Sequence, residues 1–219
     1  MSEQSVDEQD VGLRARLVDV GVELLAAQGV QALTLREIAR RAGVSHGAPR
    51  RYFPTHVALL SAIARRGFAE LAAETEKASG AAGNGAEDGA EDGAENGADQ
   101  DARTRLKALS RAYLGFAAAH RGMFELMFRH DLLESNQLGL RETSLPLFDV
   151  LVGLVAEARP GTATGTGTGA RVAAGALWAN LHGIAQLWGW GSLRLASGAD
   201  DVEALIDAAL EAHLGPAIT

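Results

Sequence analysis

Hydrophobic residues recur along most of this chain at intervals of three and four, which is the spacing of one face of an α-helix. Leu13, Leu17, Val20 and Leu24 form the first such stripe, and Gly29 follows it as a C-terminal stop. The pattern predicts an all-α fold, and no stretch has the uninterrupted apolar length of a membrane helix. The same spacing returns in later stretches: 59–71, 106–116, 123–128, 145–155, 172–188 and 202–210.

Between Thr34 and Phe53 the pattern divides into two short helices with a glycine turn between them. Thr34 and Glu37 have the spacing of a capping box, in which both side chains satisfy backbone donors at the start of a helix. Gly43 follows that helix, where a residue without a side chain adopts the left-handed backbone most easily. Ser45 is the expected N-cap of the second helix. With the preceding helix as support, this arrangement predicts a helix-turn-helix.

The second helix of the pair is basic and poor in apolar side chains. It offers His46, Arg50, Arg51 and Tyr52 within two turns before Phe53. The second helix of a helix-turn-helix lies in the major groove of DNA, while basic and hydroxyl side chains hold phosphates. The alternative is a solvated helical hairpin with a few surface arginines.

Charge is distributed unevenly along the chain. The net charge of the 219 residues is −8, but residues 13–68 contain nine arginines and three acidic residues, a net of +6, which leaves −14 for the rest. A basic N-terminal part on an acidic body is expected when only one end of a protein meets phosphate. Thr55 and His56 lie at the predicted start of the following helix, where free backbone N–H groups and the helix dipole favour a phosphate.

The chain contains no cysteine, which excludes disulfides and thiolate metal sites. The N-terminus is acidic and polar, unlike the basic and apolar start of a signal peptide. We therefore expect a cytoplasmic protein that binds no membrane, no metal and no other cofactor.

Three stretches differ in composition from the predicted helices. Residues 1–10 have the character of a disordered tail. Residues 79–101 carry seven acidic residues and no basic one, which predicts a flexible acidic insertion; the alternative is a DNA mimic that competes for the basic N-terminal part. Residues 161–169 alternate glycine with threonine or alanine and lack the pattern of a nucleotide-binding loop, so they are expected to be a flexible connector.

Aromatic and methionine side chains are concentrated in the C-terminal half and make it the candidate for a ligand pocket, since such pockets are mostly apolar with a few polar groups. Ordinary core packing is the alternative for each of these residues. For His182 the two possibilities are a hydrogen bond to a ligand and a core histidine bonded to a backbone carbonyl. The candidate pocket residues are Tyr113, Phe116, Phe124, Met127, Phe128, Trp178 and His182.

The last two predicted helices, within 171–190 and 200–210, carry more apolar surface than one bundle needs, which predicts a homodimeric four-helix interface. The small residues Gly175 and Gly183 allow another helix to approach closely. The expected organisation is a tail (1–10), a three-helix helix-turn-helix DNA-binding domain (11–71), the acidic insertion (79–101) and a larger helical ligand-binding and dimerisation domain (102–215).

These features resemble those of the TetR family of transcriptional regulators over about residues 10–70. The resemblance is carried by Thr34-Leu-Arg-Glu-Ile-Ala, Ala42-Gly-Val-Ser-His-Gly-Ala-Pro and Arg51-Tyr-Phe-Pro, followed by Ala58-Leu-Leu. Downstream, Leu177-Trp-Ala-Asn-Leu-His-Gly resembles the WHG-type C-terminal domain of part of that family.

The resemblance implies a homodimeric repressor that binds a double-stranded DNA operator and releases it when an unidentified small-molecule effector enters the C-terminal domain. Two residues depart from the family pattern: Arg50 stands where tyrosine is common, and His56 where lysine is common. Arg50 can hold a phosphate or contact guanine, and His56 contributes charge only when it is protonated. Carried over by position, the DNA contacts are Thr34, Ser45, His46, Arg50, Arg51, Tyr52, Thr55 and His56.

Two other classes of protein are alternatives to a regulator. An enzyme is disfavoured because the six histidines lack metal-ligand spacing and no nucleophile elbow is present, so no catalytic residues are assigned. The second alternative is a helical ligand-binding or scaffolding protein without DNA binding. Salt-sensitive, sequence-selective DNA binding distinguishes it from a regulator.

Overall fold

The fold is all-α, as predicted. The structure is a computed structural model that describes residues 3–83, 94–158 and 168–215. Every regular element in these ranges is a helix. Within the same ranges, none of the helices combines the length and the apolar character needed to cross a bilayer.

The helices belong to two compact units, which we call the first and the second unit. The first unit comprises Met1–Ala69 and His120–Ser144, and the second comprises Glu70–Ala119 and Leu145–Thr219. Two helices, α4 (His56–Gly83) and α8 (Leu140–Glu157), have residues in both units.

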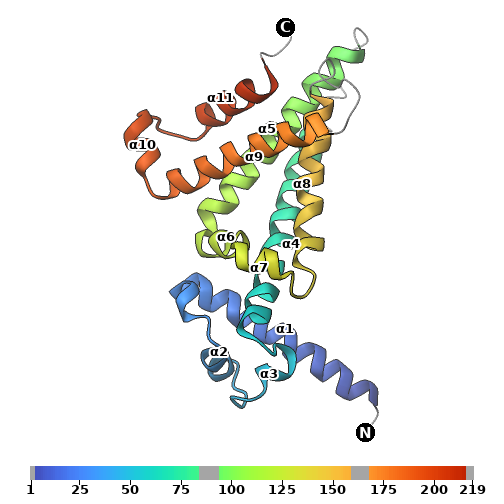
Figure 1. Ribbon diagram of the computed structural model, residues 1–219, viewed down its shortest axis with the longest axis vertical. Coiled ribbons are helices and arrows are strands. Elements are labelled where there is room, and N and C mark those ends of the chain that lie inside the picture. The colour runs from blue at the N-terminus through green and yellow to red at the C-terminus, as the bar shows by residue number, and fades with distance from the viewer. Residues whose placement is uncertain (1–2, 84–93, 159–167, 216–219) are drawn as a thin grey trace. The chain divides into compact units, whose positions relative to one another are not determined.

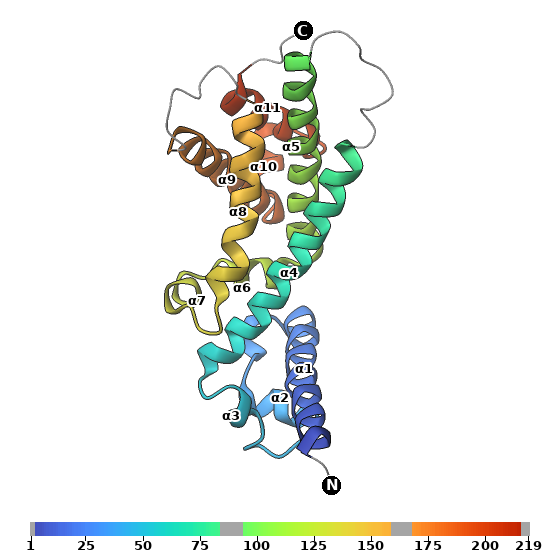
Figure 2. The same cartoon turned by 90° about the vertical axis from the view of Figure 1, so that its right-hand side faces the viewer.

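The first unit is built on the long helix α1, which packs against α2, α3 and α6. Figure 2 shows α2 and α3 beside α1. Packing is close at Gly21 of α1, where a Cβ atom would lie 2.6 Å from Cδ1 of Ile63. Besides parts of α4 and α8, the helices of this unit are α1 (Glu3–Gln28), the 3-10 helix η1 (Val30–Ala32), α2 (Leu35–Arg41), α3 (Pro49–Tyr52), α6 (Arg121–Met127) and α7 (His130–Ser135).

Helix α1 begins earlier than predicted. Residues 3–10 are helical where a disordered tail was expected, and residues 1–2 lie outside the described ranges. The physical reason is local, because residues 3–11 contain neither proline nor glycine and nothing in their backbone chemistry stops the helix.

The first unit also contains a segment that the sequence analysis assigned to the C-terminal domain. Helix α6 packs on α1, and a Cβ atom at Gly122 would lie 3.4 Å from the carbonyl oxygen of Leu25. The rings of Phe68 and Phe128 meet edge to face with centroids 5.4 Å apart. Residues 120–144, which follow the predicted DNA-binding domain in the chain, therefore pack within the first unit.

The second unit is organised around α5, α9 and α11. Helix α9 packs on α5, and α11 packs on both of them (Figure 1). Leu106 and Phe116 of α5, Leu177 and Leu181 of α9 and Ile206 of α11 are buried. Besides parts of α4 and α8, the helices of this unit are α5 (Ala94–Ala119), α9 (Thr168–Gly189), α10 (Ser192–Ser197) and α11 (Glu203–Leu214).

The ends of the predicted acidic insertion are helical. Helix α4 continues to Gly83 and α5 begins at Ala94, so residues 84–93, the centre of the insertion, lie outside the described ranges. The predicted connector at 161–169 also lies outside them, apart from its last two residues, which begin α9.

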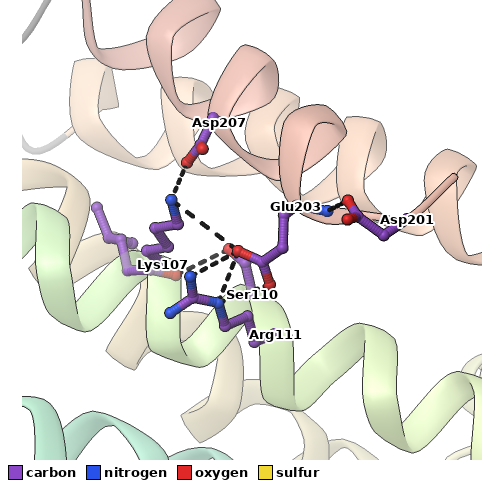
Figure 3. Close-up of polar contacts among 7 residues, drawn as sticks. Lys107, Ser110, Arg111, Asp201, Glu203 and Asp207 are labelled. Atoms are coloured by element: carbon purple, nitrogen blue, oxygen red, sulfur yellow. Dashed lines mark hydrogen bonds and ion pairs between the residues drawn. The ribbon is translucent and has the colours of Figure 1, made fainter. Parts of the chain in front are cut away.

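Helix α11 is held on α5 by a row of polar contacts (Figure 3). Arg111 Nε donates to the two carboxylate oxygens of Glu203 over 2.7 and 2.9 Å, and Lys107 pairs with Asp207. The hydrogen bond from Arg111 lowers the pKa of Glu203. At the other end of α11, Arg103 donates over 3.0 Å to the carbonyl oxygens of residues 214 and 215.

Candidate functional site

The first helix of the helix-turn-helix has the predicted cap. Thr34 is the N-cap of α2, and its Oγ1 accepts a hydrogen bond from the backbone N of Glu37 over 3.2 Å. The carboxylate of Glu37 instead accepts from Arg40 Nε over 2.8 Å and from Arg41 Nε over 2.9 Å. These arginines, Arg40 first, lower the pKa of Glu37 to about 2. Only the Thr34 half of the expected capping box is therefore present.

The turn after α2 follows the prediction for Gly43. This glycine has φ +68°, its N donates to the carbonyl of Arg40 over 3.2 Å, and the N of Val44 donates to the carbonyl of Ala39 over 3.0 Å. The two bonds form a Schellman motif, which ends a helix and fixes the direction of the chain beyond it.

The predicted N-cap role of Ser45 is wrong. Helix α3 begins at Pro49 with Ala48 as its N-cap and no side-chain cap hydrogen bond. Ser45 uses its carbonyl to accept from the N of Ala48 over 3.0 Å, and so it starts a turn that precedes the helix. Proline is favoured at the first helical position, where its missing N–H has no bond to lose, and this preference sets the start of α3.

Helix α3 presents its basic side chains to solvent. Pro49 and Phe53 are buried, and the guanidinium carbon of Arg14 lies 5.6 Å from the centre of the Phe53 ring. With these two residues facing inward, Arg50 and Arg51 are exposed. Of the other predicted contacts in and around the helix pair, Thr34, Ser45 and His46 are exposed and Tyr52 is half-buried.

Thr55 and His56 make contacts within the first unit. Thr55 caps α4, because its Oγ1 accepts from the N of Ala58 over 3.0 Å, and the same hydroxyl donates to Oε1 of Gln137 over 3.0 Å. The Nε2 of His56 hydrogen-bonds the carbonyl oxygen of Leu33. Both side chains that were predicted to hold phosphate therefore have protein partners.

The candidate pocket residues divide between the two units. Phe124, Met127 and Phe128 belong to the first, where the rings of Phe124 and Phe128 have centroids 5.0 Å apart. A Cβ atom at Gly67 would lie 2.6 Å from the sulfur of Met127, so the glycine is needed for this close packing. The other four, Tyr113, Phe116, Trp178 and His182, belong to the second unit.

In the second unit, three of these side chains form a hydrogen-bonded chain. Trp178 Nε1 donates to the hydroxyl of Tyr113 over 3.0 Å, and that hydroxyl lies 2.8 Å from Nδ1 of His182. The tryptophan can only donate, so the tyrosine hydroxyl can donate its own hydrogen bond to Nδ1. In neutral His182 the proton then lies on Nε2. Burial raises the pKa of Tyr113 and lowers that of His182, so both are held in their neutral forms.

Phe148 of α8 adjoins this chain and was missed as a site residue. Its ring lies 6.1 Å from that of Trp178, and the Arg171 guanidinium carbon lies 5.1 Å from its centre. Arg171 also donates to Asp149 over 2.8 Å. The sequence placed Phe148 on an apolar stripe but contained no signal that would join it to Trp178.

Comparison with known proteins assigns both halves of the chain. Residues 17–63 match the family model "Bacterial regulatory proteins, tetR family", and residues 106–213 match "Tetracyclin repressor-like, C-terminal domain". The helix-turn-helix lies inside the first match, and the Tyr113, Trp178 and His182 chain lies inside the second.

Individual proteins are also similar to this chain. A protein of unknown function from Rhodococcus sp. RHA1 is 34% identical, with a TM-score of 0.70 over 94% of this chain and 96% of that one. The FadR regulator of Bacillus subtilis, solved with stearoyl-CoA, has the same fold at 17% identity, with a TM-score of 0.57 over 92% of this chain and 98% of that one. The transcriptional repressor KstR of Mycolicibacterium smegmatis is 36% identical over 70 residues, which are 32% of this chain and only 34% of that repressor. The chain belongs to the TetR family of DNA-binding transcriptional regulators, a family of proteins that are not enzymes.

Proposed function

We propose that this regulator is a homodimeric repressor that leaves its operator when a small molecule binds the second unit, and that it works in the cytoplasm. The observation that carries the DNA-binding part is the geometry of the helix pair. A capped α2 and a Schellman turn fix a short α3 whose buried Pro49 and Phe53 leave Arg50 and Arg51 exposed.

We assign the groove-facing surface to Ser45, His46, Arg50 and Arg51, with Thr34 and Tyr52 beside it. Both arginines are exposed. Among the described residues, neither guanidinium has a hydrogen bond or ion pair that DNA binding would have to break. An arginine fork matches the two acceptors of guanine or the oxygens of a phosphate. Arg50 is the candidate for sequence preference because it departs from the family pattern at a groove position.

For the dimer we favour α9 together with α8, in place of the predicted pair α9 and α11. The apolar side chains of α11, among them Ile206 and Leu210, are buried within the chain. Helix α9 and the residue after it expose a different set on one face: Val172, Ala176, Ala179, Leu187 and Trp190. Helix α8 exposes Leu145 and Val150. Such patches commonly mark interaction sites, and the small alanines permit close helix packing.

The effector site is proposed around Tyr113, Trp178 and His182, which put polar atoms among buried apolar side chains of α5 and α9. Trp178, His182 and Gly183 are also the residues on which the proposed WHG-type assignment rests. Repression is supported by the likeness of 70 residues of this chain to the repressor KstR. The stearoyl-CoA bound by FadR is a property of that protein and does not name the effector here.

The test is fluorescence anisotropy with duplexes from the region upstream of the gene, at two salt concentrations. Wild type should bind one duplex selectively, and less tightly at higher salt, because phosphate contacts release counterions. Arg50→Ala should weaken binding, whereas Arg121→Ala, which removes an exposed arginine of α6 paired with Glu125, should not. Equal effects of the two variants would show that α3 is not the contact surface.

A further inference from the structure

One side chain connects the two ends of the helix-turn-helix. His56 is the first residue of α4, just after α3, and its Nε2 hydrogen-bonds the carbonyl oxygen of Leu33. Leu33 immediately precedes Thr34, the N-cap of α2. The contact therefore joins the point where the chain enters the helix pair to the point where it leaves, 23 residues later.

The chemistry of this contact does not require a charged histidine. A carbonyl oxygen can only accept, so Nε2 must donate its proton to Leu33. Neutral histidine with its proton on Nε2 makes this bond, and so does the protonated ring. A phosphate contact by the same side chain would draw its strength from the charged form.

Both helices of the pair are too short to hold their positions alone. Helix α2 has seven residues and α3 has four, and isolated helices of this length are not stable in water. Their placement must come from tertiary contacts. The buried side chain of Leu33 fixes one end, and the Thr55 hydroxyl fixes the start of α4 through the N of Ala58 and Oε1 of Gln137.

We infer that His56 is a positioning residue for DNA recognition and not a phosphate contact: its hydrogen bond to Leu33 holds α2 and α3 in their binding geometry before DNA arrives. Preordering of this kind improves affinity because less conformational freedom is lost on binding. The inference rests on the proposed assignment of the helix pair as the DNA-contact surface.

The first measurement needs no DNA. Amide hydrogen exchange in the full-length protein should be faster for residues 34–41 in His56→Ala than in wild type, because α2 loses its tether. His46→Ala, which removes an exposed histidine of the turn between α2 and α3, should leave the exchange of residues 34–41 unchanged. Unchanged exchange in His56→Ala would overturn the inference whether or not the protein binds DNA.

The second measurement uses a duplex selected from a random pool by the wild-type protein. Loss of one hydrogen bond should weaken binding by His56→Ala about 3- to 10-fold, with the same slope of log Kd against log salt as wild type. The loss should be present at both about pH 6 and about pH 8, because neutral and protonated His56 can both donate to Leu33. Arg51→Ala should instead lower the slope by about 0.9, the value for one phosphate contact.

A weakening found only at the lower pH, or a slope lowered as in Arg51→Ala, would overturn the inference in favour of a phosphate contact. If His56→Ala does not fold, His56→Gln and His56→Met carry the same test. Glutamine keeps a donor near the position of Nε2 and methionine does not. Only the methionine variant should therefore show faster exchange of residues 34–41 and weaker DNA binding. Equal exchange and equal affinity in the two variants would refute the positioning role. A wild-type protein that selects no duplex would refute the proposed function. The exchange measurement would still test whether the hydrogen bond from His56 to Leu33 holds α2 in place.

Discussion

Tyr113→Phe removes the central hydroxyl of the polar chain in the second unit while leaving the ring in place. The hydroxyl of this buried residue accepts from Trp178 over 3.0 Å and lies 2.8 Å from Nδ1 of His182. The substitution therefore deletes two hydrogen bonds and creates almost no cavity.

Each hydrogen bond contributes about 0.5–1.5 kcal/mol, so two give about 1–3 kcal/mol. Water can replace part of this, because Trp178 is 38% exposed and His182 is half-buried. We expect the free energy of unfolding to fall by about 1–2 kcal/mol, which for a chain of this size lowers Tm by about 2–8 °C.

The assay is urea unfolding followed by tryptophan fluorescence and circular dichroism, with effector absent. A double-mutant cycle with Trp178→Phe isolates the bond between the two side chains, since the phenylalanine keeps an aromatic ring but has no donor. Strict additivity in this cycle, or a Tyr113→Phe variant as stable as wild type, would refute the role assigned to the hydroxyl.

Three further predictions concern the same two units. Burial lowers the pKa of His182 from 6.5, so the unfolded chain takes up the proton before the folded protein does. The free energy of unfolding should therefore fall as pH drops below 6.5, until the folded protein is protonated too. His182→Gln should flatten this part of the pH profile in urea titrations. Gly67→Ala would place a Cβ atom 2.6 Å from Cγ of Met123 and should lower the free energy of unfolding by about 1–3 kcal/mol. Gly115 of α5 has open space around it, so Gly115→Ala should leave the free energy of unfolding unchanged or raise it by up to about 1 kcal/mol in the same measurement. Leu187→Asp on the exposed face of α9 should shift the protein toward monomer in sedimentation velocity, and Ala204→Asp on the exposed side of α11 should not; a monomer produced only by Ala204→Asp would place the interface on α11.

Local signals predicted the helix pair well. The cap of Thr34 and the left-handed Gly43 each depend on hydrogen bonds that span only three to five residues. The same kind of signal failed at Ser45, because two start signals compete there. A serine favours an N-cap, but Pro49 four residues later fits the first helical position and determines where α3 begins.

Contacts between distant parts of the chain could not be predicted. Thr55 and Gln137 are 82 residues apart, and Arg65 Nη1 reaches the carbonyl of Leu138 over 2.6 Å across 73 residues. Neither pair has a pattern in the sequence that would connect it. Leu138 also has φ +60°, an unusual backbone conformation for leucine that only the folded structure reveals.

The candidate pocket illustrates the same limit at the level of a site. Composition singled out the aromatic and methionine residues, but it could not divide them between two packing groups. In the first unit, Gly67 of α4 leaves room for Met127, and the ring of Phe128 packs against that of Phe68. In the second, Tyr113 meets His182 because α5 and α9 pack together.

The row of contacts between α5 and α11 has a consequence for how α11 finds its register (Figure 3). The acidic residues Glu203, Asp207 and Glu211 are spaced four apart, as are the basic residues of α5 that face α11. A slip of α11 by one turn, about 5.4 Å, in the direction that brings Asp207 to Arg111 and Glu211 to Lys107 would give both basic residues new carboxylates in place of the old ones. The buried Ile206, Leu210 and Leu214 repeat with the same period.

Both the charged and the apolar pattern would therefore tolerate such a slip, but the contact of Arg103 would not. Its two nitrogens bond the carbonyls of Leu214 and Gly215, which are left without an intrahelical partner at the end of α11 and exist at one place only. Through these two hydrogen bonds, Arg103 is the residue that distinguishes the correct register of α11 from its nearest competitor.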